Sequence, residues 1–328
     1  RWSARRAPWA GMLPRVDLRH IDTPASDEEA RVVEAFLGEL DRLPTTPLYE
    51  AAGRRHMLLP TLHVVQDAFG FISKGALGHI CRRLHVPPAG AYGVASFYAL
   101  FALAERPARV LHVCDDLACH TRGSGAILEA VRKGDTRQAA CLPSPCLGLC
   151  EQAPAALLTD AGKPATAHSR LTAARAAELL ERGASAHGTL TLTPQTGGDT
   201  SNLRLLARVG SVDPSSLDAY RASGGYEALR IALDRGAAYV LREVTDSGLM
   251  GRGGAAFPTG RKWASAAQAA GKRRYLVCNA DESEPGTFKD RVLMENDPFA
   301  IIEAMTIASV AIGAELGFLY VRAEYPLA

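Results

Sequence analysis

Apolar residues recur at helical spacing over the first third of the chain. DEEARVVEAFLGEL follows Ser26, which is a suitable N-cap, and its acidic residues fall in the first turn, where the helix dipole favours them. LPTLHVVQDAFG, KGALGHICRRLHV and AGAYGVASFYALFAL also have helical character and are separated by glycine and proline. The pattern predicts an N-terminal extension (1–45) with one helix and then a helical bundle (46–105).

From residue 106 the pattern alternates between strand and helix. ARVLHVC and AALLTD are strand candidates, whereas GSGAILEAVRKG and RLTAARAAELLERG are helix candidates, the second of which ends at Gly183. This order predicts a small α/β domain over 106–183. The Thr-, Ser- and Gly-rich segment 184–212 is expected to be mostly linker.

The last part of the chain contains helices followed by candidate buried elements. DPSSLDAYRASGGYEALRIALDRGAAYVLREVTDSG predicts two helices, RRYLVCN a buried strand, AIIEAMTIASVAIGAEL a buried helix, and GFLYVRAEYPLA the start of a further strand. The region 213–328 is therefore expected to be the first part of an α/β domain, since a complete one rarely stops directly after a strand.

The composition of the chain excludes several classes of protein. The 328 residues are 47% hydrophobic and 22% charged, which is ordinary for a globular protein, and the net charge is +2. This small charge gives no indication of a nucleic-acid partner. No apolar run has the length of a membrane span, and the N-terminal residues lack the apolar core of a secretory signal. We therefore expect a cytoplasmic protein.

Four of the seven cysteines form two close pairs. Cys114 ends the strand candidate ARVLHVC and Cys119 lies five residues on, whereas Cys146 and Cys150 lie in a loop before AALLTD. Four thiolates from two loops at one end of a sheet can enclose a metal centre, and Gly148 offers a tight turn and amides to sulfur. An odd total of cysteines in close pairs favours a metal site in a reducing compartment over disulfides.

Other interpretations of the cysteines remain open. Structural zinc sites favour two-residue spacings, which differ from the C-x4-C and C-x3-C spacings here, but a zinc-binding scaffold without redox function is one alternative. Thioredoxin-type chemistry needs C-x-x-C, which is absent. Four unrelated buried cysteines are a further alternative. Cys141, close to the second pair, is the rival ligand.

A family resemblance covers residues 55–182. HVVQDAFGFIS, GVASFYALF, CDDLACH and SPCLGLCEQAPAAL occur in the order found in the thioredoxin-like [2Fe-2S] subunit of respiratory complex I, which this region resembles. The resemblance implies a helical bundle joined to a thioredoxin-like domain. It also implies that Cys114, Cys119, Cys146 and Cys150 bind a [2Fe-2S] cluster.

A glycine-rich run, GLMGRGGAAFPTGRKW, occupies residues 248–263. It has neither the spacing of a dinucleotide fingerprint nor the G-K-[ST] of a Walker loop, and a helix rather than a strand is predicted before it. A loop of bare amides at a helix start can bind a phosphate or a ring carbonyl. Phe257 offers a face for stacking, and Lys262 a positive charge. A plain tight turn with a surface lysine is the alternative.

An acidic segment follows the strand candidate RRYLVCN. Asn279, Asp281, Glu282 and Glu284 stand at the C-terminal end of this strand, where ligands bind in open α/β sheets. Carboxylates there suit ribose and ribityl hydroxyl groups, which donate hydrogen bonds, better than they suit phosphates. A solvated acidic turn is the alternative.

Together these two segments resemble the flavoprotein of complex I that binds FMN and NADH, over residues 213–328. The shared features are the glycine-rich loop, Lys-Trp, Asn-Ala-Asp-Glu, Glu-Pro-Gly and Phe-Lys-Asp. The resemblance implies FMN contacts from Gly251, Arg252, Gly253, Gly254, Lys262, Asn279, Asp281 and Glu282. It implies that Phe257 stacks on NADH and that Glu284 binds it near the nicotinamide, so Lys262 and Glu284 are the candidate catalytic residues.

This region departs from the flavoprotein pattern in several places. Met250 stands where arginine is common, and Ala256 where glycine is usual. The family's Gly-Glu-Glu and Asn-Asn segments, its ubiquitin-like domain and its [4Fe-4S] domain do not occur in this sequence. The residues present are therefore expected to form half of a flavin pocket, with a [4Fe-4S] cluster expected only in the part that is missing.

Both modules in one chain resemble the fused diaphorase subunits of NAD-dependent formate dehydrogenases and NAD-reducing hydrogenases. LDAYRASGGYEALRIAL favours the formate dehydrogenase β subunit. The resemblance implies electron exchange between NAD(H), FMN and iron–sulfur clusters, with a catalytic iron–sulfur subunit as partner: formate dehydrogenase α, a hydrogenase or a complex I-like assembly. The alternatives are the equivalent module of an NADH-quinone oxidoreductase, or a non-catalytic electron-relay or assembly subunit.

Overall fold

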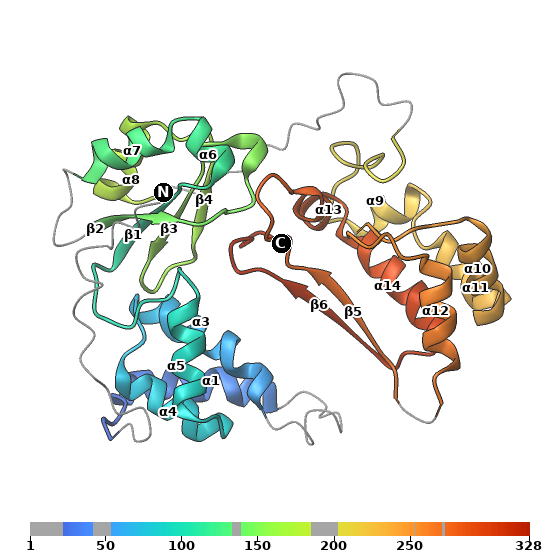
Figure 1. Cartoon of the computed structure of the whole chain (residues 1–328), viewed down its shortest axis with the longest axis horizontal. Coiled ribbons are helices and arrows are strands. Elements are labelled where there is room, and N and C mark those ends of the chain that lie inside the picture. Colours follow the sequence, from blue (N-terminus) through green and yellow to red (C-terminus); the bar gives the residue numbers. More distant parts are fainter. Residues whose placement is uncertain (1–21, 42–53, 133–138, 185–202, 253, 271–272) are drawn as a thin grey trace. The chain divides into compact units, whose positions relative to one another are not determined.

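A computed structural model describes residues 22–41, 54–132, 139–184, 203–252, 254–270 and 273–328 (Figure 1). The contacts divide the chain into a first unit, Arg1–Pro145 with Pro154–Gly188, and a second unit, Cys146–Ala153 with Thr189–Ala328. The segment Cys146–Ala153, hereafter the cysteine loop, therefore packs with the C-terminal part of the chain. The predicted α/β fold class is confirmed.

The first unit begins with a helical bundle. Its elements are α1 (Asp27–Asp41), η1 (Arg55–Met57), α3 (Leu58–Phe69), α4 (Lys74–Leu84) and α5 (Pro88–Phe97). Ser26 and Glu29 cap α1 reciprocally: Glu29 N donates to Ser26 Oγ at 3.2 Å, and Ser26 N to Glu29 Oε2 at 2.8 Å. Val33 and Leu37 of α1 are fully buried in the core of the bundle. The helix expected in the N-terminal extension thus belongs to this core.

The rest of the first unit is a four-stranded sheet with helices on one face. Its strands are β1 (Arg109–Cys114), β2 (Ala139–Ser144), β3 (Ala156–Asp160) and β4 (Thr166–His168), in the order β2-β1-β3-β4, and its helices are α6 (Leu117–Thr121), α7 (Ser124–Arg132) and α8 (Ala173–Arg182). β1 pairs with β2 in parallel, and the other pairs are antiparallel. The helices α7 and α8 lie against β1 and β2 (Figure 1). Their apolar residues pack with those of the strands to form the second core.

The second unit contains more helices than the sequence predicted. They are α9 (Leu217–Ala222), α10 (Glu227–Arg235), α11 (Ala237–Asp246), α12 (Thr259–Gln268), α13 (Lys289–Asn296) and α14 (Pro298–Ile312), with the 3-10 turn η2 (Cys150–Gln152) in the cysteine loop. Three helices rather than two precede the glycine-rich run. A Cβ on Gly225 would lie 2.2 Å from the Tyr220 ring, and Gly236 ends α10 at a φ of 78°. These glycines interrupt the helical pattern.

A two-stranded parallel sheet lies in the second unit. β5 (Tyr275–Ala280) pairs with β6 (Leu316–Val321), and α13 and α14 connect them. The expectation of a buried strand is wrong for β5, because Val277 is 61% exposed. Leu319 and Tyr320 on β6 are also exposed. The apolar pattern therefore predicted the two strands correctly, but their burial was not predicted correctly.

The predicted buried helix is only half buried. Ala308 and Ala311 of α14 are buried, whereas Ile302 is 45% exposed. No helix in the described ranges is long and apolar enough to cross a membrane. Much of the expected linker, 185–202, lies outside the described residues.

Candidate functional site

The first cysteine pair lies at the C-terminal end of β1, as predicted. Cys114 is the last residue of β1 and stands opposite Ser144 of β2, and its N–H donates to Ala155 O at 2.9 Å. Cys119 lies on α6, whose first N–H, that of Leu117, donates to Asp116 Oδ1 at 2.7 Å. Both side chains are buried. Strand pairing and a helix cap therefore fix the first pair.

The second pair lies in the cysteine loop, with its two sulfur atoms 3.3 Å apart. Gly148 N donates to Cys146 Sγ at 3.4 Å, and Gly286 N donates to Cys150 Sγ at 3.2 Å. Backbone N–H groups aimed at sulfur stabilise the thiolate form, which is the form that binds iron. The donor set and its hydrogen bonds therefore fit an iron–sulfur cluster.

The three remaining cysteines lie on other elements. Cys141 packs in the core between sheet and helices, and Cys81 in the core of the helical bundle. Cys278 is on β5. Within the described ranges, no three His, Cys, Asp or Glu side chains gather as a metal site, and the two cysteine pairs fall in different units. The binding of one cluster by all four cysteines stays a prediction.

The glycine-rich run forms a closed loop before α12. Met250 and Pro258 make an antiparallel bridge, and Gly251 N donates to Phe257 O at 2.8 Å. At the base, a Cβ on Gly260 would lie 2.4 Å from Thr245 Oγ1. Only glycine lets α12 approach α11 this closely. The close packing of these two helices fixes the position of the residues at the end of the loop.

The tip of this loop is open to solvent. Arg252 and Gly254 are exposed, and Phe257 is 51% exposed with the Arg261 guanidinium 5.8 Å from its ring centroid. The Lys262 side chain is exposed and, within the described part of the chain, has no hydrogen-bond or ion-pair partner. A loop with bare backbone, one open ring face and a free cation fits the chemistry of a flavin site. Gly253 lies outside the described residues.

The residues after β5, 281–286, form what we call the acidic loop. Asn279 Oδ1 accepts a hydrogen bond from Asp281 N at 3.2 Å, and the backbone oxygen of Glu284 accepts one from Thr287 Oγ1 at 2.5 Å. Asn279 and Glu284 are exposed and Asp281 is half-buried. Among the described residues no hydrogen bond or ion pair joins this loop to the glycine-rich run. The predicted FMN contacts of both segments therefore remain predictions.

Glu282 differs from its neighbours because its carboxylate is buried and fully engaged. It accepts hydrogen bonds from Asp290 N at 2.8 Å, Arg291 N at 3.0 Å and Tyr325 Oη at 3.1 Å. Burial, followed by the charge of Glu282, raises the pKa of Tyr325. The side chain of Glu282 thus holds the N-terminus of α13. Its contact with FMN, implied by the resemblance, stays a prediction.

Two arginines next to the cysteine loop, Arg291 (buried) and Arg322 (half-buried), were missed from the sequence. Arg291 is 1% exposed; its Nε donates to Gly148 O at 3.0 Å, and its guanidinium pairs with Glu151 and Glu295. Arg322 donates to Cys146 O at 2.5 Å and to Glu282 O at 2.9 Å. An arginine is normally exposed, so its residue type alone gave no signal of burial.

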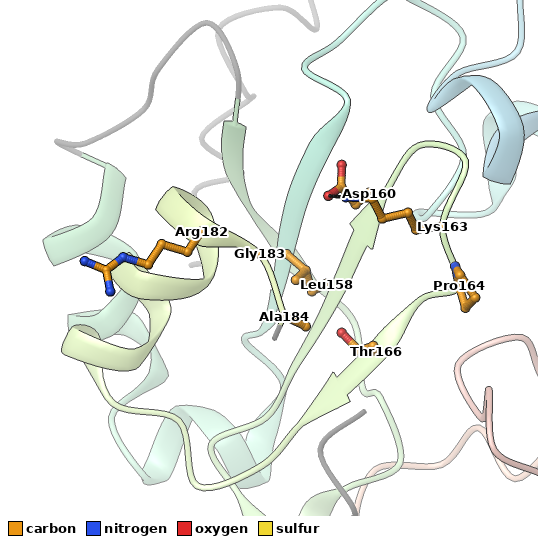
Figure 2. A pocket seen from close by; sticks show the side chains of 8 residues that line it. All are labelled: Leu158, Asp160, Lys163, Pro164, Thr166, Arg182, Gly183 and Ala184. Atoms are coloured by element: carbon orange, nitrogen blue, oxygen red, sulfur yellow. Dashed lines mark hydrogen bonds and ion pairs between the residues drawn. The ribbon is translucent and has the colours of Figure 1, made fainter. Parts of the chain in front are cut away.

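A shallow pocket of about 240 Å³ lies elsewhere in the first unit (Figure 2). It is lined by Leu158, Asp160, Lys163, Pro164, Thr166, Arg182, Gly183 and Ala184. Asp160 pairs with Lys163 at 2.9 Å and, at the start of β1, with Arg109 at 3.0 Å. Since Cys114 ends the same strand, the pocket is at the opposite end of the sheet. It contains none of the predicted site residues.

Comparison with protein families gives two matches along the chain. Residues 46–184 match the thioredoxin-like [2Fe-2S] ferredoxin family. Residues 244–328 match the Nuo51 FMN-binding domain. These ranges contain, respectively, the two cysteine pairs and the glycine-rich and acidic segments.

Several characterised proteins are similar to the chain. A component of the NADH-quinone oxidoreductase of Rhizobium meliloti is 52% identical over 37% of this chain and 29% of its own length. The NAD-reducing hydrogenase HoxS subunit alpha of Cupriavidus necator is 30% identical over 87% of this chain and 49% of its own length. A crystal structure of an NAD+-reducing [NiFe]-hydrogenase matches with a TM-score of 0.62 and 30% identity, covering 82% of this chain and 46% of the hydrogenase chain.

The two hydrogenase matches extend over both units, and the chain spans half or less of the length of all three relatives. The resemblance of the two regions to the thioredoxin-like [2Fe-2S] and FMN-binding proteins is confirmed, whereas the resemblance to the formate dehydrogenase β subunit stays a prediction. Along the chain, a match to the thioredoxin-like [2Fe-2S] ferredoxin family is thus followed by a match to the Nuo51 FMN-binding domain, and most of the chain is similar to the hydrogenase HoxS subunit alpha.

Proposed function

We propose that this chain is a diaphorase module, which exchanges electrons between NAD(H), FMN and a [2Fe-2S] cluster within a larger complex. The observation that carries the proposal is the order of the two domains in one chain, shared with the hydrogenase HoxS subunit alpha over 87% of the chain. A zinc scaffold or a non-catalytic relay does not account for an FMN-binding domain that has its glycine-rich and acidic segments in place.

Bound FMN would supply the group that exchanges two electrons with NAD(H) and single electrons with iron–sulfur centres. The open amides of the glycine-rich loop would bind the cofactor, with Phe257 stacking on the nicotinamide nucleotide. Lys262, with no partner among the described residues, would hold a positive charge near the flavin ring. The exposed carboxylate of Glu284 is free to accept hydrogen bonds from the nucleotide.

The partner that we favour is the catalytic subunit of a cytoplasmic NAD-dependent formate dehydrogenase. The sequence LDAYRASGGYEALRIAL, which forms α9 and α10, supports this choice. An NAD-reducing hydrogenase is the second candidate, supported by the similarity to the HoxS subunit alpha. Purification of the natural complex and identification of the subunit bound to this chain would separate the two. Formate-dependent reduction of NAD+ is the expected activity.

The cluster assignment can be tested by replacing each cysteine in the natural complex. Cys119→Ser and Cys146→Ser are expected to remove the [2Fe-2S] signal in electron paramagnetic resonance (EPR) and two iron atoms per chain, because each deletes a thiolate ligand. Cys278→Ser is the matched control, since Cys278 lies on β5 and is not among the predicted ligands. Zinc in place of iron in the wild-type complex would overturn the proposal.

The flavin assignment can be tested at Lys262. Lys262→Met is expected to lower the FMN reduction potential and weaken FMN binding, because the charge that favours the anionic reduced flavin is removed. Arg230→Met, which changes an exposed cation on α10, is the control. Unchanged potential and flavin content in Lys262→Met would place this lysine outside the flavin site.

A further inference from the structure

The cysteine loop and the acidic loop are joined by hydrogen bonds at several points. Gly286, in the acidic loop, donates its N–H to Cys150 Sγ at 3.2 Å. Arg322 donates to Cys146 O and, through its other terminal nitrogen, to Glu282 O. A segment implicated in nucleotide binding and a predicted ligand pair of the cluster are thus in direct contact.

Arg291 anchors the cysteine loop through its guanidinium group. Its guanidinium is almost completely buried and bonds to Gly148 O and Glu151, both in the cysteine loop, and to Glu295 on its own helix. Burying a guanidinium costs several kcal/mol unless its donors are paired. Because two of its partners belong to the cysteine loop, the burial of Arg291 is satisfied only when that loop is in place.

The helix that carries Arg291 is itself tied to the acidic loop. The carboxylate of Glu282 accepts from the N–H groups of Asp290 and Arg291 at the start of α13. The Tyr325 hydroxyl donates to the same carboxylate, and the Tyr325 ring fills the space where a Cβ of Gly148 would lie. The acidic loop, α13 and the cysteine loop therefore form one hydrogen-bonded assembly within the second unit.

We propose that Arg291 and Arg322 are positioning residues that fix the cysteine loop on the acidic loop. The Gly286 N–H then donates to Cys150 Sγ. The two guanidinium groups place positive charge beside the second ligand pair, where it offsets the carboxylates of Glu151, Glu295 and Glu324 with which they pair. Hydrogen bonds to sulfur and nearby positive charge raise the reduction potential of an iron–sulfur cluster, because the reduced form carries more negative charge. The proposal rests on the proposed function in one respect, that Cys146 and Cys150 bind the cluster.

The test is an EPR-monitored redox titration of the natural complex that contains this chain. Arg291→Met is expected to lower the midpoint potential of the [2Fe-2S] cluster, because a charge and the support of the Gly286 hydrogen bond are lost. A change of about tenfold in the one-electron equilibrium constant corresponds to about 59 mV. Arg291→Lys keeps the charge and is expected to restore part of the shift. Arg230→Met, on the surface of the same unit, is expected to have the wild-type potential.

Iron content and circular dichroism separate the possible outcomes. An unchanged potential in a folded, iron-loaded Arg291→Met complex overturns the proposal. If that variant does not fold, Arg322→Met decides in the same way, because it removes the bond to Cys146 O and leaves Arg291 in place. A wild-type complex without a [2Fe-2S] signal would instead overturn the proposed function, whatever the variants do.

Discussion

The two units of the chain bury different kinds of side chain. Apolar clusters fill the interior of the first unit, one in the helical bundle and one between the sheet and its helices. The clusters of the second unit are smaller. Within the described ranges, the buried Asp, Glu and Arg residues all lie in the second unit: Glu282, Arg291, Asp297 and Glu303.

The buried charges of the second unit act as connectors between its elements. Glu303 on α14 accepts hydrogen bonds from Tyr220 Oη at 2.5 Å, Tyr226 N at 2.8 Å and Leu229 N at 3.0 Å. It therefore joins α9 and the start of α10 to α14. Apolar packing tolerates many substitutions of similar volume, whereas a buried carboxylate requires every one of its donors. The second unit is thus specified by fewer and less replaceable contacts.

The largest effect is expected from a cavity in the first unit. Leu179 of α8 is fully buried in the core beneath the sheet, and Leu179→Ala should lower the free energy of unfolding by about 2–5 kcal/mol. Urea denaturation measures the loss, and hydrogen exchange locates it in the first unit. Leu233→Ala, at a position 62% exposed on α10, is the control. A loss below about 1 kcal/mol for Leu179→Ala would contradict the apolar account of this unit.

A polar substitution of nearly equal shape should damage the second unit. Glu303→Gln keeps the volume but removes the charge and replaces one acceptor oxygen with a donor. We therefore expect the free energy of unfolding to fall by about 1.5–3 kcal/mol, the contribution of a hydrogen bond to a charged group. Glu227→Gln, which changes a solvent-exposed ion pair with Arg230, should cost below about 1 kcal/mol. Hydrogen exchange of the second unit measures the loss of stability. If exchange became equally faster in both variants, the buried Glu303 would stabilise the unit no more than the exposed Glu227 does.

The smallest effect concerns an ion pair in the first unit and depends on pH. Burial opposes ionisation of Asp160, but hydrogen bonds from Lys163 and Arg109 lower its pKa overall. A lowered pKa means that the carboxylate stabilises the fold above the unfolded-state pKa of about 3.9 and that this stability is lost as pH falls through the folded-state pKa. Asp160→Asn should remove this pH-dependent contribution to the free energy of unfolding, which we expect to be below about 1 kcal/mol. The free energy of unfolding is measured against pH for the wild type and for Asp160→Asn. Curves that stay parallel below about pH 5 would contradict a contribution from the Asp160 carboxylate.

The sequence predicted the elements that local chemistry determines. Ser26 caps α1 as expected, Gly70 ends α3 with a left-handed conformation, and β1 ends at Cys114. β2 was missed because AACLPS is short and contains a proline, and β4 because it has three residues. The burial of a strand depends on what packs against it, which periodicity does not report.

At the candidate site, the sequence located the cysteine pairs but not their surroundings. The pairing of cysteines and the glycine between Cys146 and Cys150 are local signals. The N–H of Gly286 reaches Cys150 from a distant part of the chain, and Arg291 has the residue type of a surface position. Such contacts arise only when remote segments pack together, so a single sequence contains no pattern from which to infer them.

The close approach of Gly148 and Tyr325 has a consequence for how this family can change during evolution. A side chain at position 148 would overlap the tyrosine ring, and the backbone there has a φ of 69°. Position 148 is therefore constrained twice, because loss of the ring at 325 would remove the overlap but leave a backbone conformation that favours glycine. In an alignment of related chains, we expect glycine to persist at 148 even where the residue at 325 is not aromatic.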